Sequence, residues 1–204
     1  MKRTKNRQSD ALASVRETVD LRIVGGKLRG RPLAYSGDER TRPMKDRVRE
    51  AVFNLLGPRV VGCHAVDLFA GTGALGLEAI SRGAVHATFL ERHLPTCKLI
   101  ESNAAQLGVG EQVDVQFADT FKWNKLEQLP ADRAWLVFCS PPYEFYVSRR
   151  DDLLQLIERF HAAAPDGSLF VVEADERFDY GLLPSAEQWD VRPYLPAVVG
   201  VMEK

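Results

Sequence analysis

The chain has 204 residues, of which 45% are hydrophobic and 27% are charged, as is usual for one globular domain. No apolar run approaches the ~18 residues that a membrane-spanning helix needs, and the first residues are basic without an apolar stretch, so we expect neither a membrane span nor a secretory signal. The three cysteines and four histidines are scattered without metal-ligand spacing, so we expect reduced thiols, a cytoplasmic protein and no bound metal.

The charges are distributed unevenly along the chain. The first 50 residues carry 14 Lys and Arg against 7 Asp and Glu, whereas the remaining residues carry 13 against 21. A basic N-terminal quarter on an acidic body favours a polyanionic partner that binds from one side. The alternative is a solvated tail, and for residues 1–20, which show no sustained periodicity, we expect a flexible basic arm.

Residues 21–58 contain the first structured elements that the sequence predicts. Two β-prone runs, Leu21–Val24 and Lys27–Leu33, flank a Gly-Gly break and predict a small β-hairpin. A basic cluster, Arg40–Arg47, leads into a helix that ends at Gly57-Pro58. The residues that we expect to form its apolar stripe are Val48, Ala51, Val52, Leu55 and Leu56.

From residue 59 to residue 204, strand and helix patterns alternate and form the main domain that we predict. The expected strands are Ala65–Phe69, Ala87–Leu90, Val113–Phe117, Trp135–Cys139 and Ser168–Val172, and the expected helices are Ala74–Arg82, Pro95–Leu107, Arg149–Ala163 and a short one near Trp123–Leu129. Two further β-like runs, Gln188–Arg192 and Ala197–Met202, predict a closing antiparallel hairpin. The fold class is therefore α/β, with a Rossmann-like, doubly wound, mostly parallel seven-stranded sheet.

The first strand-to-helix turn, Asp67–Gly76, contains the pattern G-x-G-x-x-G. Alone this pattern is a weak signal, because dinucleotide-binding folds share it. Asp67 argues against a dinucleotide, since a carboxylate four residues before the first glycine would repel a pyrophosphate but suits a cationic ligand. S-adenosylmethionine, which carries a sulfonium and an ammonium group, is such a ligand.

Two more acidic residues follow strand ends. Glu91 lies 20 residues after Gly71, where an acidic side chain can accept hydrogen bonds from both ribose hydroxyls, and Asp119 is positioned to accept from an adenine amino group. Each carboxylate alone could be a helix cap or a loop acid, but three of them around one glycine turn favour a nucleoside cofactor. The predicted cofactor-binding residues are Asp67, Phe69, Ala70, Gly71, Thr72, Gly73, Gly76, Glu91 and Asp119.

The tetrapeptide Ser140-Pro141-Pro142-Tyr143 follows a run of five apolar residues that predicts a strand buried on both faces. Two prolines end the strand because neither has an N–H to donate. Ser140 Oγ and the Pro141 carbonyl can accept from an amino group, and the Tyr143 ring can stack on a planar base. Taken alone, the tetrapeptide fits a Pro-Pro turn with a core tyrosine equally well. Beside the strand-end acids it predicts four catalytic residues, Ser140, Pro141, Pro142 and Tyr143.

Together these motifs resemble those of class I S-adenosylmethionine-dependent methyltransferases. More narrowly, the basic hairpin Arg22–Arg31, the run from Arg42 to Asn54 and the segment Asp67–Ala79 are similar to bacterial small-subunit ribosomal RNA guanine-N2 methyltransferases. The resemblance extends from Leu21 to the C-terminus. The sequence departs from that family at Ser140, where an aspartate is usual, or an asparagine in the wider superfamily, and at Met44, where threonine is common. Serine is a shorter and neutral acceptor.

The resemblance implies methyl transfer from S-adenosylmethionine to the N2 amine of a guanine in 16S ribosomal RNA. The partner would be that RNA or the assembling small subunit, and we expect a monomer. The residues expected to dock RNA phosphates are Arg22, Lys27, Arg29, Arg31, Arg42, Lys45, Arg47 and Arg49. Ion pairs with the acidic body are the alternative role for these side chains.

Two other functions remain open from the sequence. The same fold and tetrapeptide would suit methylation of adenine-N6 in DNA or RNA, or of a protein glutamine, since both present a planar amino group. A relative that binds RNA or cofactor without transferring methyl groups is the non-enzymatic alternative, and the neutral Ser140 is the feature that favours it.

Overall fold

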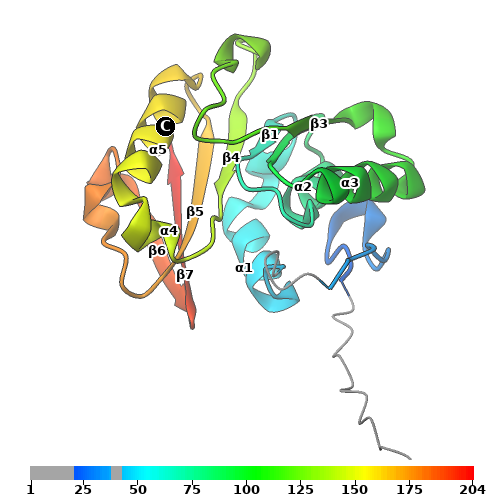
Figure 1. Ribbon diagram of the computed structural model, residues 1–204, viewed down its shortest axis with the longest axis horizontal. Helices are drawn as coiled ribbons and strands as arrows, with labels where there is room; N and C mark the ends of the chain where they lie inside the picture. Colours follow the sequence, from blue (N-terminus) through cyan, green and yellow to red (C-terminus); the bar gives the residue numbers. More distant parts are fainter. Residues whose placement is uncertain (1–20, 38–42) are drawn as a thin grey trace, which may run out of the picture.

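The computed structural model describes residues 21–37 and 43–204. Within these residues, a seven-stranded sheet of order β3-β2-β1-β4-β5-β7-β6 forms the centre of the molecule (Figure 1). Every strand runs in one direction except β7, which is antiparallel to both of its neighbours. The predicted fold class, including the C-terminal antiparallel hairpin, is confirmed.

The elements have the following bounds. The strands are β1 (His64–Asp67), β2 (His86–Glu91), β3 (Val113–Phe117), β4 (Trp135–Cys139), β5 (Leu169–Asp175), β6 (Asp190–Tyr194) and β7 (Ala197–Glu203). The α-helices are α1 (Asp46–Leu56), α2 (Ala74–Ser81), α3 (Leu94–Leu107), α4 (Phe145–Ser148) and α5 (Arg150–Ala163). Short 3-10 turns are η1 (Gly26–Leu28), η3 (Gly57–Val60), η4 (Gly110–Gln112), η5 (Leu126–Gln128), η6 (Tyr180–Leu182) and η7 (Ala186–Gln188). None of the described helices is long and apolar enough to span a membrane.

Two layers of helices cover the two faces of the sheet. Helices α1, α2 and α3 lie on one face, and α4 and α5 lie on the other (Figure 1). Alternate residues of the inner strands supply the two hydrophobic clusters, so that Ala65 and Phe138 pack into the first and Val66 and Val137 into the second. The continuous apolar sequence of β4 follows from this burial on both sides.

The strand order reverses between β1 and β4. The chain continues from β1 to β2 and β3 on one side, and from β4 to β5 on the other. Loops that leave the carboxyl ends of β1 and β4 therefore diverge, and open α/β sheets bind their ligands in the crevice that this divergence creates.

Strands β3 and β4 have the predicted bounds, whereas β1 ends two residues before the predicted end at Phe69. The backbone separates from the regular ladder at this point. Leu68 N donates to Phe138 O on one side, and Ala70 N donates to Leu90 O on the other. The turn that follows is thus anchored to both neighbouring strands.

Strand β5 extends three residues beyond the predicted end at Val172, because β7 pairs with it as far as Asp175. The helix expected near Trp123–Leu129 is reduced to the turn η5, and the short helix α4 was not predicted. The longer β5 matters for function, since it carries Glu173 to the same edge of the sheet as the end of β4.

The predicted N-terminal hairpin is present as two antiparallel arms joined by a single bridge between Arg22 and Pro32. Two backbone hydrogen bonds flank this bridge: Ile23 N donates to Arg31 O at 2.9 Å, and Leu33 N donates to Leu21 O at 2.8 Å. The arms pack into the same cluster as α1 and α2 through buried apolar side chains, Leu21, Ile23 and Leu33. A functional division at residue 58 remains a prediction.

Candidate active site

A cavity of about 720 Å³ lies at the carboxyl ends of the inner strands. Two sets of sequence-predicted residues line it together. From the cofactor set these are Phe69, Gly71, Glu91 and Asp119, and from the catalytic set they are Ser140, Pro141, Pro142 and Tyr143. Asp67, Ala70, Thr72, Gly73 and Gly76, the other predicted cofactor residues, support the turn behind the cavity wall and do not line it. The structure thus brings the two predicted motifs into one site.

The glycine turn requires glycine for two different reasons. Gly73, the N-cap of α2, has φ +74°, in the left-handed region that side chains rarely adopt. A Cβ on Gly76 would lie 2.3 Å from the Phe89 ring, so glycine allows α2 to approach β2 closely. These positions keep the turn tight and bring its backbone to the edge of the cavity.

Glu91 connects the glycine turn to the next loop. One carboxylate oxygen accepts from Gly71 N at 2.9 Å, and the other accepts from His93 N at 2.7 Å. Each carboxylate oxygen has a second lone pair, so the carboxylate can still accept from a ligand in the cavity. This arrangement fits the predicted role of Glu91 towards a pair of ribose hydroxyls.

Asp67 is buried at the end of β1, and neither of its carboxylate oxygens has a hydrogen-bond partner in the described structure. Burial raises the pKa of Asp67 to about 7, although the backbone N–H groups of Gly76 and Phe69 oppose this in part. These two N–H groups lie near the carboxylate without meeting hydrogen-bond geometry. An unpaired buried carboxylate behind the glycine turn favours a cationic ligand next to that turn.

Three phenylalanines form an apolar wall of the cavity. The Phe69 ring lies 5.6 Å from Phe121 and 6.3 Å from Phe145, measured between ring centroids. The guanidinium of Arg149 lies over the outer Phe121 ring at 3.6 Å. Asp119, half-buried beside this wall, accepts from Phe121 N at 3.2 Å and keeps its second oxygen for a ligand. A planar ring with an amino group, such as adenine, fits the combination.

Sequence reasoning named Phe69 but missed Phe121 and Phe145. Each of them stands two residues after a predicted site residue, Phe121 after Asp119 in the loop that follows β3, and Phe145 after Tyr143 at the start of α4. Only the packing of α4 against the loop after β3 reveals that they share a wall, since the Phe121 and Phe145 ring centroids lie 6.0 Å apart. The fit of this chain's residues to S-adenosylmethionine rests on the wall, the open lone pairs of Glu91 and the orphaned carboxylate of Asp67.

The largest omission is Glu173, which lies on β5 directly beside the tetrapeptide Ser140–Tyr143. Ser140 Oγ donates to Glu173 Oε2, and the Tyr143 hydroxyl donates to Glu173 Oε1 at 2.9 Å. The Tyr146 hydroxyl donates to the backbone oxygen of Glu173 at 2.8 Å. Burial, and then the Glu173 carboxylate, raise the pKa of Tyr143, so its phenol stays protonated and acts as a donor.

The basic residues predicted to dock RNA differ in their availability. Lys27, Arg29, Lys45 and Arg47 are exposed, and Lys45 also lines the cavity. Arg22 and Arg31 are exposed but have partners, Asp46 for Arg22 at 3.1 Å and the Gln106 backbone oxygen for Arg31 at 3.2 Å. Arg42 lies outside the described residues.

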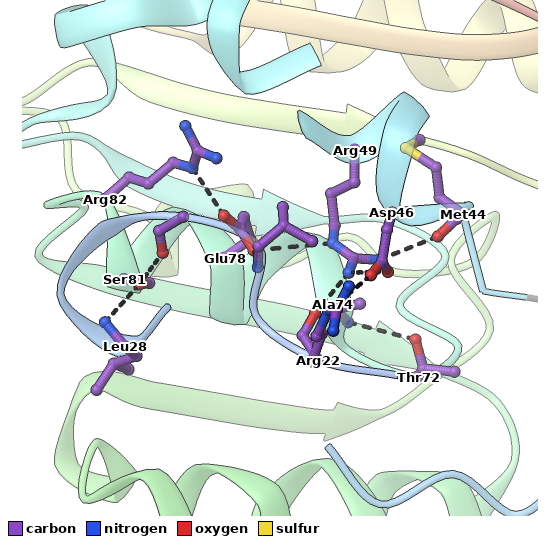
Figure 2. Close-up of polar contacts among 12 residues, drawn as sticks. Arg22, Leu28, Met44, Asp46, Arg49, Thr72, Ala74, Glu78, Ser81 and Arg82 are labelled. Atoms are coloured by element: carbon purple, nitrogen blue, oxygen red, sulfur yellow. Dashed lines mark hydrogen bonds and ion pairs between the residues drawn. The ribbon is translucent and has the colours of Figure 1, made fainter. Parts of the chain in front are cut away.

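Arg49 requires a correction, because its side chain is fully buried and cannot contact RNA phosphates. It donates to Met44 O at 3.0 Å, Arg22 O at 2.6 Å and Asp46 Oδ1 at 2.9 Å, and its Nε lies 3.8 Å from Glu78 Oε2 (Figure 2). A buried arginine is tolerated when its charge is paired in this way.

Glu78 on α2 is the centre of this buried network. Its carboxylate accepts from Val24 N at 2.8 Å and from Arg82 Nε at 2.7 Å, while Arg49 approaches from α1 (Figure 2). The network therefore joins the N-terminal arms, α1 and the helix that follows the glycine turn. The helix face that we predicted also changes, since the buried residues of α1 are Val48, Arg49, Val52, Phe53 and Leu56.

The sequence profile of one protein family, described as Conserved hypothetical protein 95, matches residues 21–191. The chain belongs to this family. YlbH of Bacillus subtilis, named as a candidate rRNA methyltransferase, is 32% identical over 157 residues, which are 77% of this chain and 83% of that protein. Ribosomal RNA small subunit methyltransferase D of Escherichia coli is 46% identical over 123 residues, 60% of each chain.

A solved structure agrees with these sequence relatives. YhhF from Escherichia coli, named as a candidate methyltransferase, superposes with a TM-score of 0.74 at 31% identity, over 90% of this chain and 97% of that one. Family and fold together identify the chain as a class I methyltransferase that uses S-adenosyl-L-methionine. Within the described residues, no group of three or more His, Cys, Asp or Glu side chains could hold a metal ion.

Proposed function

We propose that this methyltransferase transfers a methyl group from S-adenosylmethionine to the exocyclic N2 amine of a guanine in small-subunit ribosomal RNA. The observation that carries the proposal is the single cavity in which the glycine turn and Glu91 lie together with Ser140–Tyr143. The names of the relatives support ribosomal RNA as the substrate. We further propose that the protein acts as a monomer in the cytoplasm.

The cofactor half of the cavity holds the donor. S-adenosylmethionine supplies an electrophilic methyl group when it is bound. The free lone pairs of Glu91 accept from the ribose, the phenylalanine wall and Asp119 hold the adenine, and the turn at Gly71 faces the rest of the molecule. These residues bind and orient the cofactor and exclude water from it.

The acceptor half orients the base. The lone pair of a guanine amine is delocalised into the ring, so the amine is a poor nucleophile. Hydrogen bonds from its two protons to Ser140 Oγ and the Pro141 carbonyl favour the geometry in which the lone pair points out of the ring plane. Tyr143 stacks on the extruded base, a contact worth about 1–3 kcal/mol. Orientation and desolvation then supply most of the acceleration.

The basic N-terminal surface docks the RNA. Helix α1 begins at the cavity, where Lys45 lines the wall and Arg47 is exposed beside it. Lys27, Arg29 and Arg31 extend the positive charge along the N-terminal arms, with Arg22 and Arg42 as further members of the proposed surface. Contacts of this kind bind phosphates and position the target without reading the sequence.

The test is methylation in vitro of naked 16S ribosomal RNA, assembled small subunits and DNA, followed by mass analysis of the nucleosides. We expect N2-methylguanosine from one of the two ribosomal substrates. Ser140→Ala should lower turnover far more than cofactor affinity, because Ser140 contacts the acceptor. N6-methyladenine as the product, or methylation of a protein glutamine, would contradict the proposal, and cofactor binding without turnover on any substrate would favour the non-enzymatic alternative.

A further inference from the structure

Glu173 occupies a position that the proposed function leaves unexplained. Strand pairing aligns Cys139 with Val172, so the next residues along each strand, Ser140 and Glu173, emerge side by side at the cavity. The Glu173 residue is 7% exposed, and none of the ion pairs among the described residues includes it. Burying a carboxylate without a cation is costly unless hydrogen bonds satisfy it, and here Ser140 and Tyr143 donate to its two oxygens.

The hydrogen bonds of Glu173 determine whether the Ser140 hydroxyl donates to a ligand or accepts from it. A serine hydroxyl has one proton and two lone pairs, so by itself it can either donate or accept. Here Ser140 donates its only proton to Glu173 Oε2, while the Tyr143 phenol occupies Oε1 at 2.9 Å. Ser140 Oγ can therefore only accept from a group in the cavity. An amino group offers protons to such an acceptor, whereas a carbonyl oxygen or a ring nitrogen with a lone pair does not.

We propose that Glu173 is a positioning residue for methyl transfer: it makes Ser140 an obligatory acceptor and receives, through Ser140, the proton that the methylated amine loses. The proposal rests on the proposed function, since it requires an amine as the acceptor. It also accounts for a neutral serine at this position, because the charge that a longer acidic side chain would bring directly is supplied from the neighbouring strand.

The proton balance of the step is complete. The N–C bond forms as the C–S bond of the donor breaks, and the amine nitrogen becomes positively charged. One N–H proton then moves to Ser140 Oγ while the Ser140 proton moves to Glu173 Oε2, which leaves a neutral secondary amine and a protonated Glu173. Glu173 returns the proton to solvent when the product leaves. No oxidant, reductant or further reactant is needed.

A purely structural role for Glu173 is the competing explanation. In that case the carboxylate would only hold Tyr143 in place and tie β5 to β4. Such a role predicts that replacing Glu173 lowers stability or cofactor affinity, and that the loss is the same whether or not Ser140 is present. The proposed role predicts that the effect of Glu173 depends on Ser140, and this dependence can be measured with a double-mutant cycle.

The experiment uses the full chain with five variants: Glu173→Gln, Ser140→Ala, the double variant of these two, Ser140→Asp combined with Glu173→Gln, and Glu176→Gln. Glu176 is an exposed glutamate three residues further along the chain that does not line the cavity, so it controls for the loss of one negative charge. Single-turnover rates are measured on the ribosomal substrate that the wild type methylates, together with the KM for RNA, the Kd of S-adenosylhomocysteine by calorimetry and the thermal unfolding midpoint.

We expect Glu173→Gln to lower the rate by about 100-fold, the usual contribution of a positioned proton acceptor, with KM, Kd and the unfolding midpoint nearly unchanged. In the Ser140→Ala background the same change should lower the rate by less than about 3-fold, since the two residues act as a unit. A variant that restores a carboxylate directly, Ser140→Asp combined with Glu173→Gln, should recover at least about 10-fold over Glu173→Gln alone.

Three results would overturn the inference. They are a wild-type rate in Glu173→Gln, an equal loss in both backgrounds, and a loss that Glu176→Gln reproduces. The methylated nucleoside identifies the acceptor independently of the double-mutant cycle. If the wild type methylates an amine other than guanine N2, the proposed function fails, while the cycle still measures the role of Glu173. If guanine N2 is methylated and the cycle shows no coupling, only the present inference fails.

Discussion

Asp67 is a carboxylate whose charged form the fold opposes. Its carboxylate is buried without a hydrogen-bond partner, and this environment raises its pKa to about 7 from an ordinary value of 3.8. The folded state therefore binds more protons than the unfolded state between about pH 4 and pH 7. The free energy of unfolding of the wild type should fall as the pH rises through this window, as far as Asp67 contributes.

Replacing Asp67 by Asn tests this environment. The variant stays neutral, so its stability relative to the wild type should increase from pH 4 to pH 7, by on the order of a few kcal/mol, and level off above pH 7. Urea unfolding at several pH values, followed by tryptophan fluorescence, measures the difference. Asp166→Asn, at an exposed position, controls for the loss of one charge. A stability difference between Asp67→Asn and the wild type that does not change with pH would show that other groups stabilise the ionised Asp67 carboxylate in the folded protein.

At the scale of elements, helix α1 combines two roles on two faces. Its buried face carries Arg49 in the network with Glu78, and its exposed face carries Arg47 near the cavity. Removing one member of a buried ion pair leaves the other charge unsatisfied, whereas removing an exposed charge usually changes stability little. Substitutions of these two arginines, which are two residues apart, should therefore differ in their effect on stability.

Arg49→Met should lower the free energy of unfolding by about 3–5 kcal/mol, because it leaves Glu78 partly unpaired between α1 and α2. Arg47→Met, on the same helix, should change it by less than about 0.5 kcal/mol. Urea unfolding measures both changes in stability. The RNA affinity of the two variants is also compared at a fixed salt concentration, where only Arg47→Met is expected to weaken binding directly. Equal stability of the two variants would contradict the structural role of Arg49.

At the scale of the whole molecule, charge is segregated along the chain and the fold places part of the basic segment beside the cavity. The N-terminal arms and α1 pack on one face of the sheet (Figure 1), and Lys45 at the start of α1 lines the cavity. RNA that binds this basic surface would thus reach the active site directly. Arg133, in contrast, lies two residues before β4 begins, at the amino ends of the parallel strands, whereas the cavity lies at their carboxyl ends.

Docking through phosphates predicts a steep dependence of RNA affinity on salt. Arg29→Ala and Arg47→Ala should each weaken binding and reduce the slope of log affinity against log salt by about 1, as expected for the loss of one phosphate contact. Arg133→Ala should leave the slope unchanged. Filter-binding titrations across a range of salt concentrations measure these slopes. If all three variants share the wild-type slope, the N-terminal surface does not bind the RNA backbone.

Several features followed from local sequence alone. The apolar run Trp135–Cys139 and the prolines after it determine where β4 begins and ends, because burial on both faces requires apolar residues and proline cannot continue the ladder. The G-x-G-x-x-G spacing likewise specifies the turn after β1, since left-handed backbone and close packing both require glycine. The alternation of strands and helices predicted the parallel sheet for the same reason: each pattern is local and periodic.

Other features were decided only when distant segments packed together. Arg49 occupies a position where the helical period alone allows either face, and the Glu78 carboxylate on another helix makes burial possible. Glu173 stands 33 residues after Ser140, and only the pairing of β4 with β5 brings the two side chains into hydrogen-bond contact. Periodicity and turn chemistry act over a few residues, whereas strand order and the pairing of buried charges depend on the free energy of the whole packed core, which no single stretch of sequence contains.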